Sequence, residues 1–141
     1  MPVNPEELSI LKMVLAMVIF LVASVWDIRK RIVPNFLPTL LALIAFLPVS
    51  RVHVGGILVA VLLLVLGIFV GGIGGGDIKM IAAYGLVRGV LEVTIGVTIA
   101  MLLLILFHGL TGRIRKQREG KAYPLMPFLM IGCMAAGLIC L

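Results

Sequence analysis

Two aspartates, Asp27 and Asp77, stand out because each interrupts largely apolar surroundings. Two carboxyl groups that are brought close together do not easily both ionise, so they tend to share one proton. One carboxylate can then act as a base toward a water molecule, while the protonated one polarises a peptide carbonyl. This division of roles is the chemistry of aspartyl proteolysis, and it needs neither a metal ion nor another cofactor.

The chain has only six acidic residues, so the other four can be considered one by one. Glu6 and Glu7 lie in the N-terminal segment ahead of the first long apolar run, and Glu119 lies in a basic loop. Glu92 follows Arg88 by four residues, which predicts an ion pair on one face of a helix. The two aspartates are left without an evident surface role.

Each aspartate also has a purely structural explanation. Asp77 follows glycines and begins a predicted helix, so it could be an N-cap residue. Asp27 could pair with Arg31, four residues further on, or with other basic groups nearby that face the lipid. Gly74 and Gly76 could allow helices to pack closely or allow a substrate backbone to approach the carboxylate. The spacing of these residues leaves both explanations open.

The elements that must position the aspartates are apolar helices. Hydrophobic residues make up 62% of the 141 residues, and charged residues only 13%. The mean hydropathy is +1.28, which indicates a lipid bilayer as the natural surroundings. Because the N-terminus is acidic and no cleavage site follows it, the first apolar run is expected to remain in the protein. We therefore predict an all-α polytopic membrane protein, a single domain over residues 1–141, with about six transmembrane helices at about 8–26, 35–50, 55–73, 77–87, 89–108 and 124–141.

Lysine and arginine residues indicate which helix ends face the cytoplasm. They gather at residues 27–34 and 111–122, and Lys79 lies beside the glycine-rich turn. The 50 residues between the two aspartates correspond to two spans of about 20 residues plus short ends. Both aspartates are therefore expected at the cytoplasmic face, with both termini outside. This topology explains the net charge of +6 better than binding to nucleic acid does.

The predicted helix at 77–88 is short for a membrane span. At 1.5 Å per residue it is about 18 Å long, whereas the hydrocarbon core is about 30 Å thick. Either the bilayer thins locally, or the helix begins below the cytoplasmic surface beside a wet cavity. A re-entrant hairpin is the third arrangement that the sequence allows.

Cysteine and histidine residues are not expected to take part in the chemistry. Cys133 and Cys140 lie seven residues apart in the last apolar run, which favours a packing role over a disulfide or a metal site. His53 and His108 lie near opposite ends of their spans without a partner nearby in the sequence, so no metal site is predicted.

Three segments resemble motifs of the type IV prepilin peptidases, which are GxGD-type membrane aspartyl proteases. The segment "DIRKRIVPN", Asp27 to Asn35, resembles the first aspartate motif of the family. The segment "GGGDIK", Gly74 to Lys79, resembles the GxGD motif. The segment that opens the last span of the family is similar to "YPLMPFLMIG", Tyr123 to Gly132. Met126 stands where the family pattern has glycine, and we expect no effect of this difference on catalysis.

The resemblance implies an enzyme of the cytoplasmic membrane that removes the short basic leader of type IV pilin-like precursors. Cleavage of these class III signal peptides would follow a glycine at the cytoplasmic face. The short chain resembles the compact, peptidase-only form without the N-terminal methyltransferase domain. The resemblance implies Asp27 and Asp77 as the catalytic pair, with Gly74, Gly76, Pro34 and Asn35 in substrate binding or positioning, and no cofactor.

Two other functions compete with this interpretation. A small proton-coupled transporter or channel could use the same two aspartates as a relay. Such a relay requires a polar path across the bilayer, and the sequence offers almost none in its outer half. A non-catalytic assembly subunit would leave two costly intramembrane aspartates unexplained.

Overall fold

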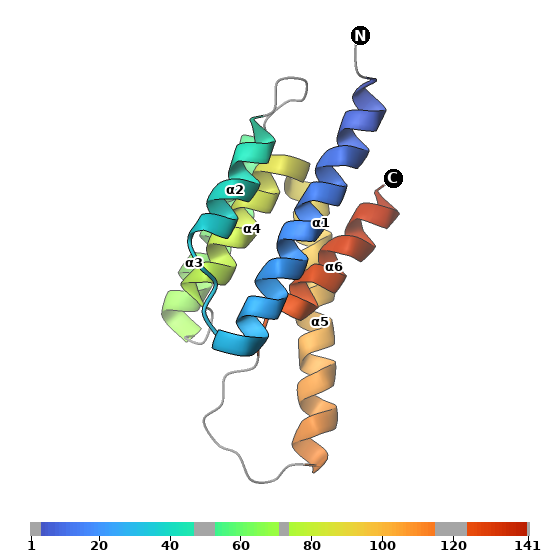
Figure 1. The fold of residues 1–141 in the computed structure, drawn as a ribbon. Helices are drawn as coiled ribbons and strands as arrows, with labels where there is room; N and C mark the ends of the chain where they lie inside the picture. Colours follow the sequence, from blue (N-terminus) through green and yellow to red (C-terminus); the bar gives the residue numbers. More distant parts are fainter. Residues whose placement is uncertain (1–3, 47–52, 71–73, 115–123, 141) are drawn as a thin grey trace.

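The computed structural model describes residues 4–46, 53–70, 74–114 and 124–140, and these residues form a helical bundle without strands (Figure 1). The helices are α1 (Pro5–Lys30), α2 (Phe36–Ala45), α3 (Ile57–Val70), α4 (Gly75–Arg88), α5 (Val90–Ile114) and α6 (Met126–Ile139), with a 3₁₀ turn at Val54–Gly56 ahead of α3. The predicted all-α class is confirmed, and each of the six predicted segments corresponds to one helix. Helices α1, α4 and α5 are longer than expected.

Two helices in the described part of the chain are long and apolar enough to cross a membrane, by length and composition. They are α1, with 26 residues, and the Val90–Gly112 part of α5, with 23 residues. Shorter apolar helices cover Phe36–Ala45, Val54–Phe69 and Met126–Ile139.

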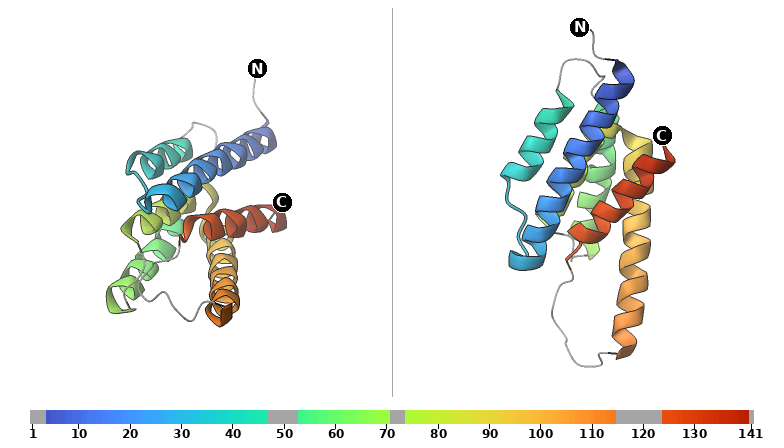
Figure 2. Two further views of the ribbon diagram at one scale, coloured as in Figure 1. Left: turned by 60° about the horizontal axis from the view of Figure 1, so that its bottom comes forward. Right: turned by 45° about the vertical axis from the view of Figure 1, so that its right-hand side comes forward.

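Successive helices alternate in direction, so that α1, α3 and α5 run one way and α2, α4 and α6 run back (Figures 1 and 2). Asp27, near the end of α1, and Asp77, near the start of α4, therefore lie at the same end of the bundle. We call this end the aspartate end. The described parts nearest the N- and C-termini both lie toward the opposite end, which we call the terminal end.

Helix α4 is the central element of the bundle and packs against α2, α3 and α5. Its buried residues include Met80, Ile81, Tyr84 and Val87. It is one uninterrupted helix of 14 residues from the aspartate end to the terminal end, about 21 Å long. Because neighbouring helices surround α4, its length does not have to match the thickness of a bilayer.

Glycines allow two close approaches between backbones. A Cβ atom on Gly132 would collide with the carbonyl oxygen of Gly96, so α6 and α5 touch through their backbones. A Cβ atom on Gly56 would likewise collide with the backbone of Gly85 in α4. Both contacts exist only because glycine has no side chain.

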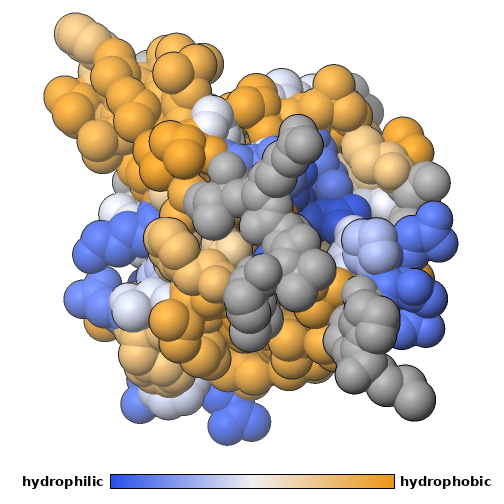
Figure 3. Space-filling model, turned by 90° about the horizontal axis from the view of Figure 1, so that it is seen from above, coloured by the Kyte–Doolittle hydropathy of each residue, from blue (hydrophilic) through white to orange (hydrophobic). Residues whose placement is uncertain are grey.

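Much of the outer surface is apolar. Leu58, Ile68 and Phe69 of α3 are each more than 70% exposed, at 72%, 74% and 82%. Seen from the terminal end, hydrophobic residues cover much of the surface, and hydrophilic residues form patches between them (Figure 3). Such extensive apolar exposure is unusual for a soluble monomer and typical of a surface that another apolar phase covers.

Candidate active site

Asp27 is a buried carboxylate near the end of α1. Its exposed fraction is 7%, and the buried residues Ala23 and Ser24 lie on the same inward face of the helix. The helix ends at Lys30, because Arg31 takes a left-handed conformation (φ 54°) and its N–H donates to the backbone oxygen of Asp27 at 2.8 Å. Within the described residues, the side chains of Asp27 and Arg31 form no ion pair. The structural explanation for Asp27 from sequence spacing is therefore wrong.

Asp77 lies in the first turn of α4, where it is half-buried. Gly74 occupies the N-cap position, and its backbone oxygen accepts from the N–H of Asp77 at 3.1 Å. The N-cap role considered for Asp77 is therefore wrong. An acid in the first turn of a helix interacts favourably with the helix dipole. The carboxyl groups of Asp77 and Asp27 are close enough for their charges to interact.

The start of α6 contacts Asp27 directly. The backbone N–H of Met126 donates to Oδ2 of Asp27 at 3.2 Å. The first N–H groups of a helix have no partner within the helix, so a carboxylate at that position satisfies one of them. Since any residue except proline has this N–H, the methionine in place of glycine preserves the contact. The Met126 side chain itself is fully buried.

Two of the three glycines at the start of α4, Gly74 and Gly76, fit tightly against their surroundings. A Cβ atom on Gly76 would lie 2.9 Å from Cβ of Val33, in the connection between α1 and α2. A Cβ atom on Gly74 would lie 3.0 Å from Oδ2 of Asp77. A Cβ atom on Gly75 would meet nothing within 4 Å. Gly76 thus allows the two aspartate segments to approach each other, and Gly74 leaves room for the Asp77 carboxylate.

A hydrogen bond joins the same two segments. Nζ of Lys79 donates to Oδ1 of Asn35 at 2.9 Å, across 44 residues of sequence. Asn35 also accepts at its backbone oxygen from the Thr39 hydroxyl at 2.9 Å, and the oxygen of Pro34 accepts from the N–H of Leu37 at 3.2 Å. Pro34 and Asn35 therefore shape the turn into α2, and Asn35 holds this turn against α4.

Aromatic packing supports the connection between α1 and α2 from the other side. The rings of Trp26 and Phe36 meet edge to face with centroids 6.2 Å apart, and the Lys30 ammonium lies 5.2 Å from the Trp26 ring centroid. In the sequence, Lys79 indicated only the topology, and its contact with Asn35, 44 residues away, had no local signal. The contact between Trp26 and Phe36 was likewise not predicted.

A buried polar cluster lies at the terminal end. Nε of Arg88 lies 2.7 Å from Oε2 of Glu92, which confirms the predicted ion pair. The Tyr84 hydroxyl donates to Glu92 at 2.7 Å, and Nη1 of Arg88 donates to the Ser9 hydroxyl at 2.9 Å. Lys12 is 2% exposed, with Nζ 3.5 Å from the oxygen of Ala45.

The structure therefore places several polar side chains together at the terminal end. On α4, however, the apolar residues Met80 and Ile81 lie between Asp77 and the polar cluster. Among the residues described, no group of three or more His, Cys, Asp or Glu side chains could hold a metal ion.

The six predicted site residues thus all lie at the aspartate end, on the two segments that Lys79 and Asn35 join. Comparisons with known proteins agree with the resemblance noted in the sequence. The family model described as the type IV leader peptidase family matches residues 14–110, a range that includes both aspartates. Neither the curated proteins nor the solved structures gave a match. Since the family model covers more than half of the sequence, the chain belongs to the type IV leader peptidase family.

Proposed function

We propose that this protein is a membrane aspartyl endopeptidase that removes the leader of type IV pilin-like precursors, and that residues 1–141 form its single transmembrane domain. One observation carries the proposal. Asp27 and Asp77, from different helices, lie at the same end of the bundle, on the two segments that the hydrogen bond between Lys79 and Asn35 joins. Family membership supports peptidase activity in general.

The proposed reaction is direct hydrolysis by a water molecule between the two carboxyl groups. Asp27 and Asp77 share one proton, and the ionised carboxylate takes a proton from the water as the oxygen attacks the peptide carbonyl. The protonated carboxyl donates its proton to the carbonyl oxygen, which gives a tetrahedral intermediate. The carboxyl that took the proton from the water then gives it to the amine nitrogen, the C–N bond breaks, and the hydroxyl proton returns to the other carboxylate as the leader is released.

Helix N-termini support the single negative charge of this pair. Asp77 lies in the first turn of α4, and Asp27 accepts from the first residue of α6. Both positions favour negative charge, because unpaired N–H groups and the helix dipole point toward it. Asn35 and Pro34 position the Asp27 segment, and Gly74 and Gly76 leave the space in which the carboxylates approach each other.

The apolar outer surface supports a location in the cytoplasmic membrane with several spans. At the aspartate end, Arg29, Lys30, Arg31 and Lys79 provide the positive charges that favour a cytoplasmic position. The candidate site would then meet the basic leader in the cytoplasm, while the apolar helix of the precursor stays in the bilayer. The proposed partners are therefore the precursor protein and the lipid bilayer.

Co-expression with a pilin-like precursor tests this proposal by the loss of the leader on a gel. Asp27→Asn and Asp77→Asn should each abolish cleavage while the variant accumulates in the membrane. Glu6→Gln and Glu7→Gln serve as matched controls, because both residues are exposed in α1 toward the terminal end. Cleavage should continue in a strong chelator. Normal processing by either aspartate variant would refute the carboxylate pair.

A further inference from the structure

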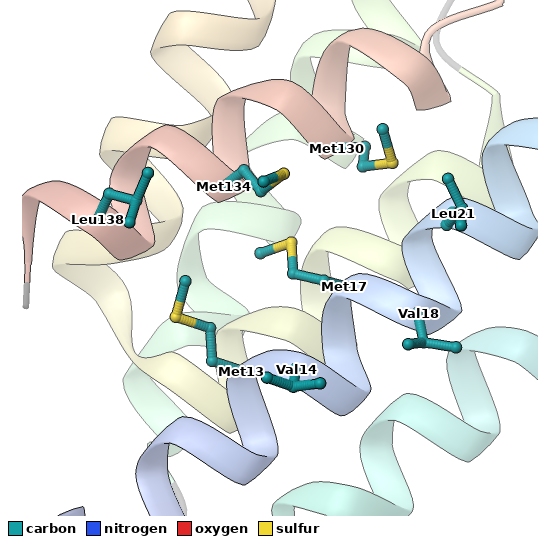
Figure 4. A pocket seen from close by; sticks show the side chains of 8 residues that line it. All are labelled: Met13, Val14, Met17, Val18, Leu21, Met130, Met134 and Leu138. Atoms are coloured by element: carbon teal, nitrogen blue, oxygen red, sulfur yellow. The ribbon is translucent and has the colours of Figure 1, made fainter.

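A groove of about 400 Å³ lies between α1 and α6 on the outside of the bundle (Figure 4). Met13 and Met17 point from α1 toward α6, where Met130 and Met134 form the facing wall (Figure 4). Residues at spacings of four form a ridge along each helix. The α1 wall, from Met13 to Leu21, is about 12 Å long, which is slightly more than two helical turns.

Methionine distinguishes this groove from other apolar surfaces of the protein. Four of the eight methionines in the chain line it, whereas α2 and α3 contain none. The highly exposed positions of α3 are leucine, isoleucine and phenylalanine. Methionine adapts its shape to irregular partners and is frequent on surfaces that bind several different helices. A fluid lipid chain adapts by itself, so the methionines indicate a protein partner.

The groove leads to the candidate active site along both walls. On α1, Leu21 precedes Asp27 by six residues, about 9 Å along the helix. On α6, Met130 lies one turn beyond Met126, whose N–H binds Asp27. The hydrogen bond between Met126 and Asp27 therefore joins α6 to α1 at the aspartate end. A helix in this groove would point its end at the carboxylates.

We infer that this groove binds the apolar helix of the precursor, an inference that rests on the peptidase function proposed above. The docked helix ends near Leu21, and about three extended residues cover the remaining 9 Å to the aspartates. The scissile bond thus lies in a short unwound stretch, where both carboxyl groups can reach its carbonyl. Adaptable walls allow one enzyme to accept pilin-like helices of different sequence.

Filling the groove tests this inference with the purified enzyme and a full-length precursor in detergent. Met17→Trp and Met134→Trp should each raise KM about tenfold or more, the loss expected when a large side chain loses its buried contacts. The value of kcat should stay within about twofold, because the carboxylates are untouched. Leu62→Trp on α3 is the control, since Leu62 is 60% exposed and lies outside the groove. Groove variants that cleave like this control would overturn the inference.

Disulfide cross-linking gives a second measurement that does not depend on cleavage. Met17→Cys or Met134→Cys, combined with Cys140→Ser and Asp77→Asn, should cross-link to a precursor with a single cysteine in its apolar helix. Cys133 can remain because it is buried. Leu62→Cys should not cross-link. Cross-links between two enzyme chains, or no cross-link with the precursor, would overturn the inference. Cross-linking of the precursor together with a wild-type enzyme that does not cleave would instead refute the peptidase function.

Discussion

Replacing Gly76 by alanine is the sharpest test of how the aspartates are brought together. The new Cβ atom would lie 2.9 Å from Cβ of Val33, whereas ordinary van der Waals contacts begin at 3.4 Å. Neither atom is at the end of a flexible side chain, so rotation of a side chain cannot relieve the clash. The α1–α2 connection and the start of α4 must therefore move apart by about 0.5 to 1 Å, taking the 3.4 to 4 Å contact range as the target.

The expected effect follows from the sensitivity of catalysis to geometry. A misplacement of about 1 Å can cost on the order of a hundredfold in rate. We therefore expect Gly76→Ala to lower kcat between tenfold and a hundredfold, which corresponds to about 1.4 to 2.7 kcal/mol of activation free energy. Alanine is favoured over glycine in a helix by up to about 1 kcal/mol. General unfolding of α4 is thus a poor explanation for such a loss.

The neighbouring glycines provide matched controls in a cleavage assay with purified precursor. Gly75→Ala should cleave at the wild-type rate, because its Cβ atom would meet nothing within 4 Å. Gly74→Ala should have an intermediate effect, since the Asp77 carboxylate at 3.0 Å can rotate away. The reasoning is refuted if Gly76→Ala cleaves normally, or if Gly75→Ala is impaired as much as Gly76→Ala.

Three further predictions concern single contacts. Lys79→Met should lower kcat severalfold because it removes the hydrogen bond to Asn35, and Lys79→Arg should restore most of it; equal rates for both variants would argue against the contact. Met126→Gly should leave kcat unchanged, because glycine keeps the N–H that donates to Asp27. The loss of a fully buried side chain should lower the free energy of unfolding by about 2 to 5 kcal/mol, measured by thermal denaturation in detergent. Loss of cleavage in folded protein would contradict this prediction. Gly132→Ala should prevent accumulation in the membrane because its Cβ atom would collide with the backbone of α5, whereas Gly112→Ala, which meets nothing within 4 Å, should accumulate normally on an immunoblot.

The helices and the common position of the aspartates could be predicted because both depend on local or additive properties. Apolar runs determine the six helices. The length of chain between Asp27 and Asp77 indicates that the chain leaves the aspartate end and returns to it. The ion pair of Arg88 and Glu92 follows from helical spacing alone. These features do not depend on how distant side chains meet.

The contacts that complete the site could not be predicted, because they join distant segments. Lys79 and Asn35 are 44 residues apart, and nothing near either residue marks the other as a partner. The contact of Met126 with Asp27 uses a backbone N–H. Almost every residue type has this donor, so the residue type does not indicate the contact. The burial of Lys12 depends on the packing of α1 against α2, which local sequence does not reveal.

The hydrogen bond between Met126 and Asp27 has a consequence for biogenesis. The two residues are 99 positions apart, and α6 is synthesised after helices α1 to α5. A nascent chain that has already inserted both acids still lacks the donor for one of them. The candidate active site is therefore complete only after α6 has been synthesised, and a translation product truncated before α6 would lack this hydrogen bond to Asp27.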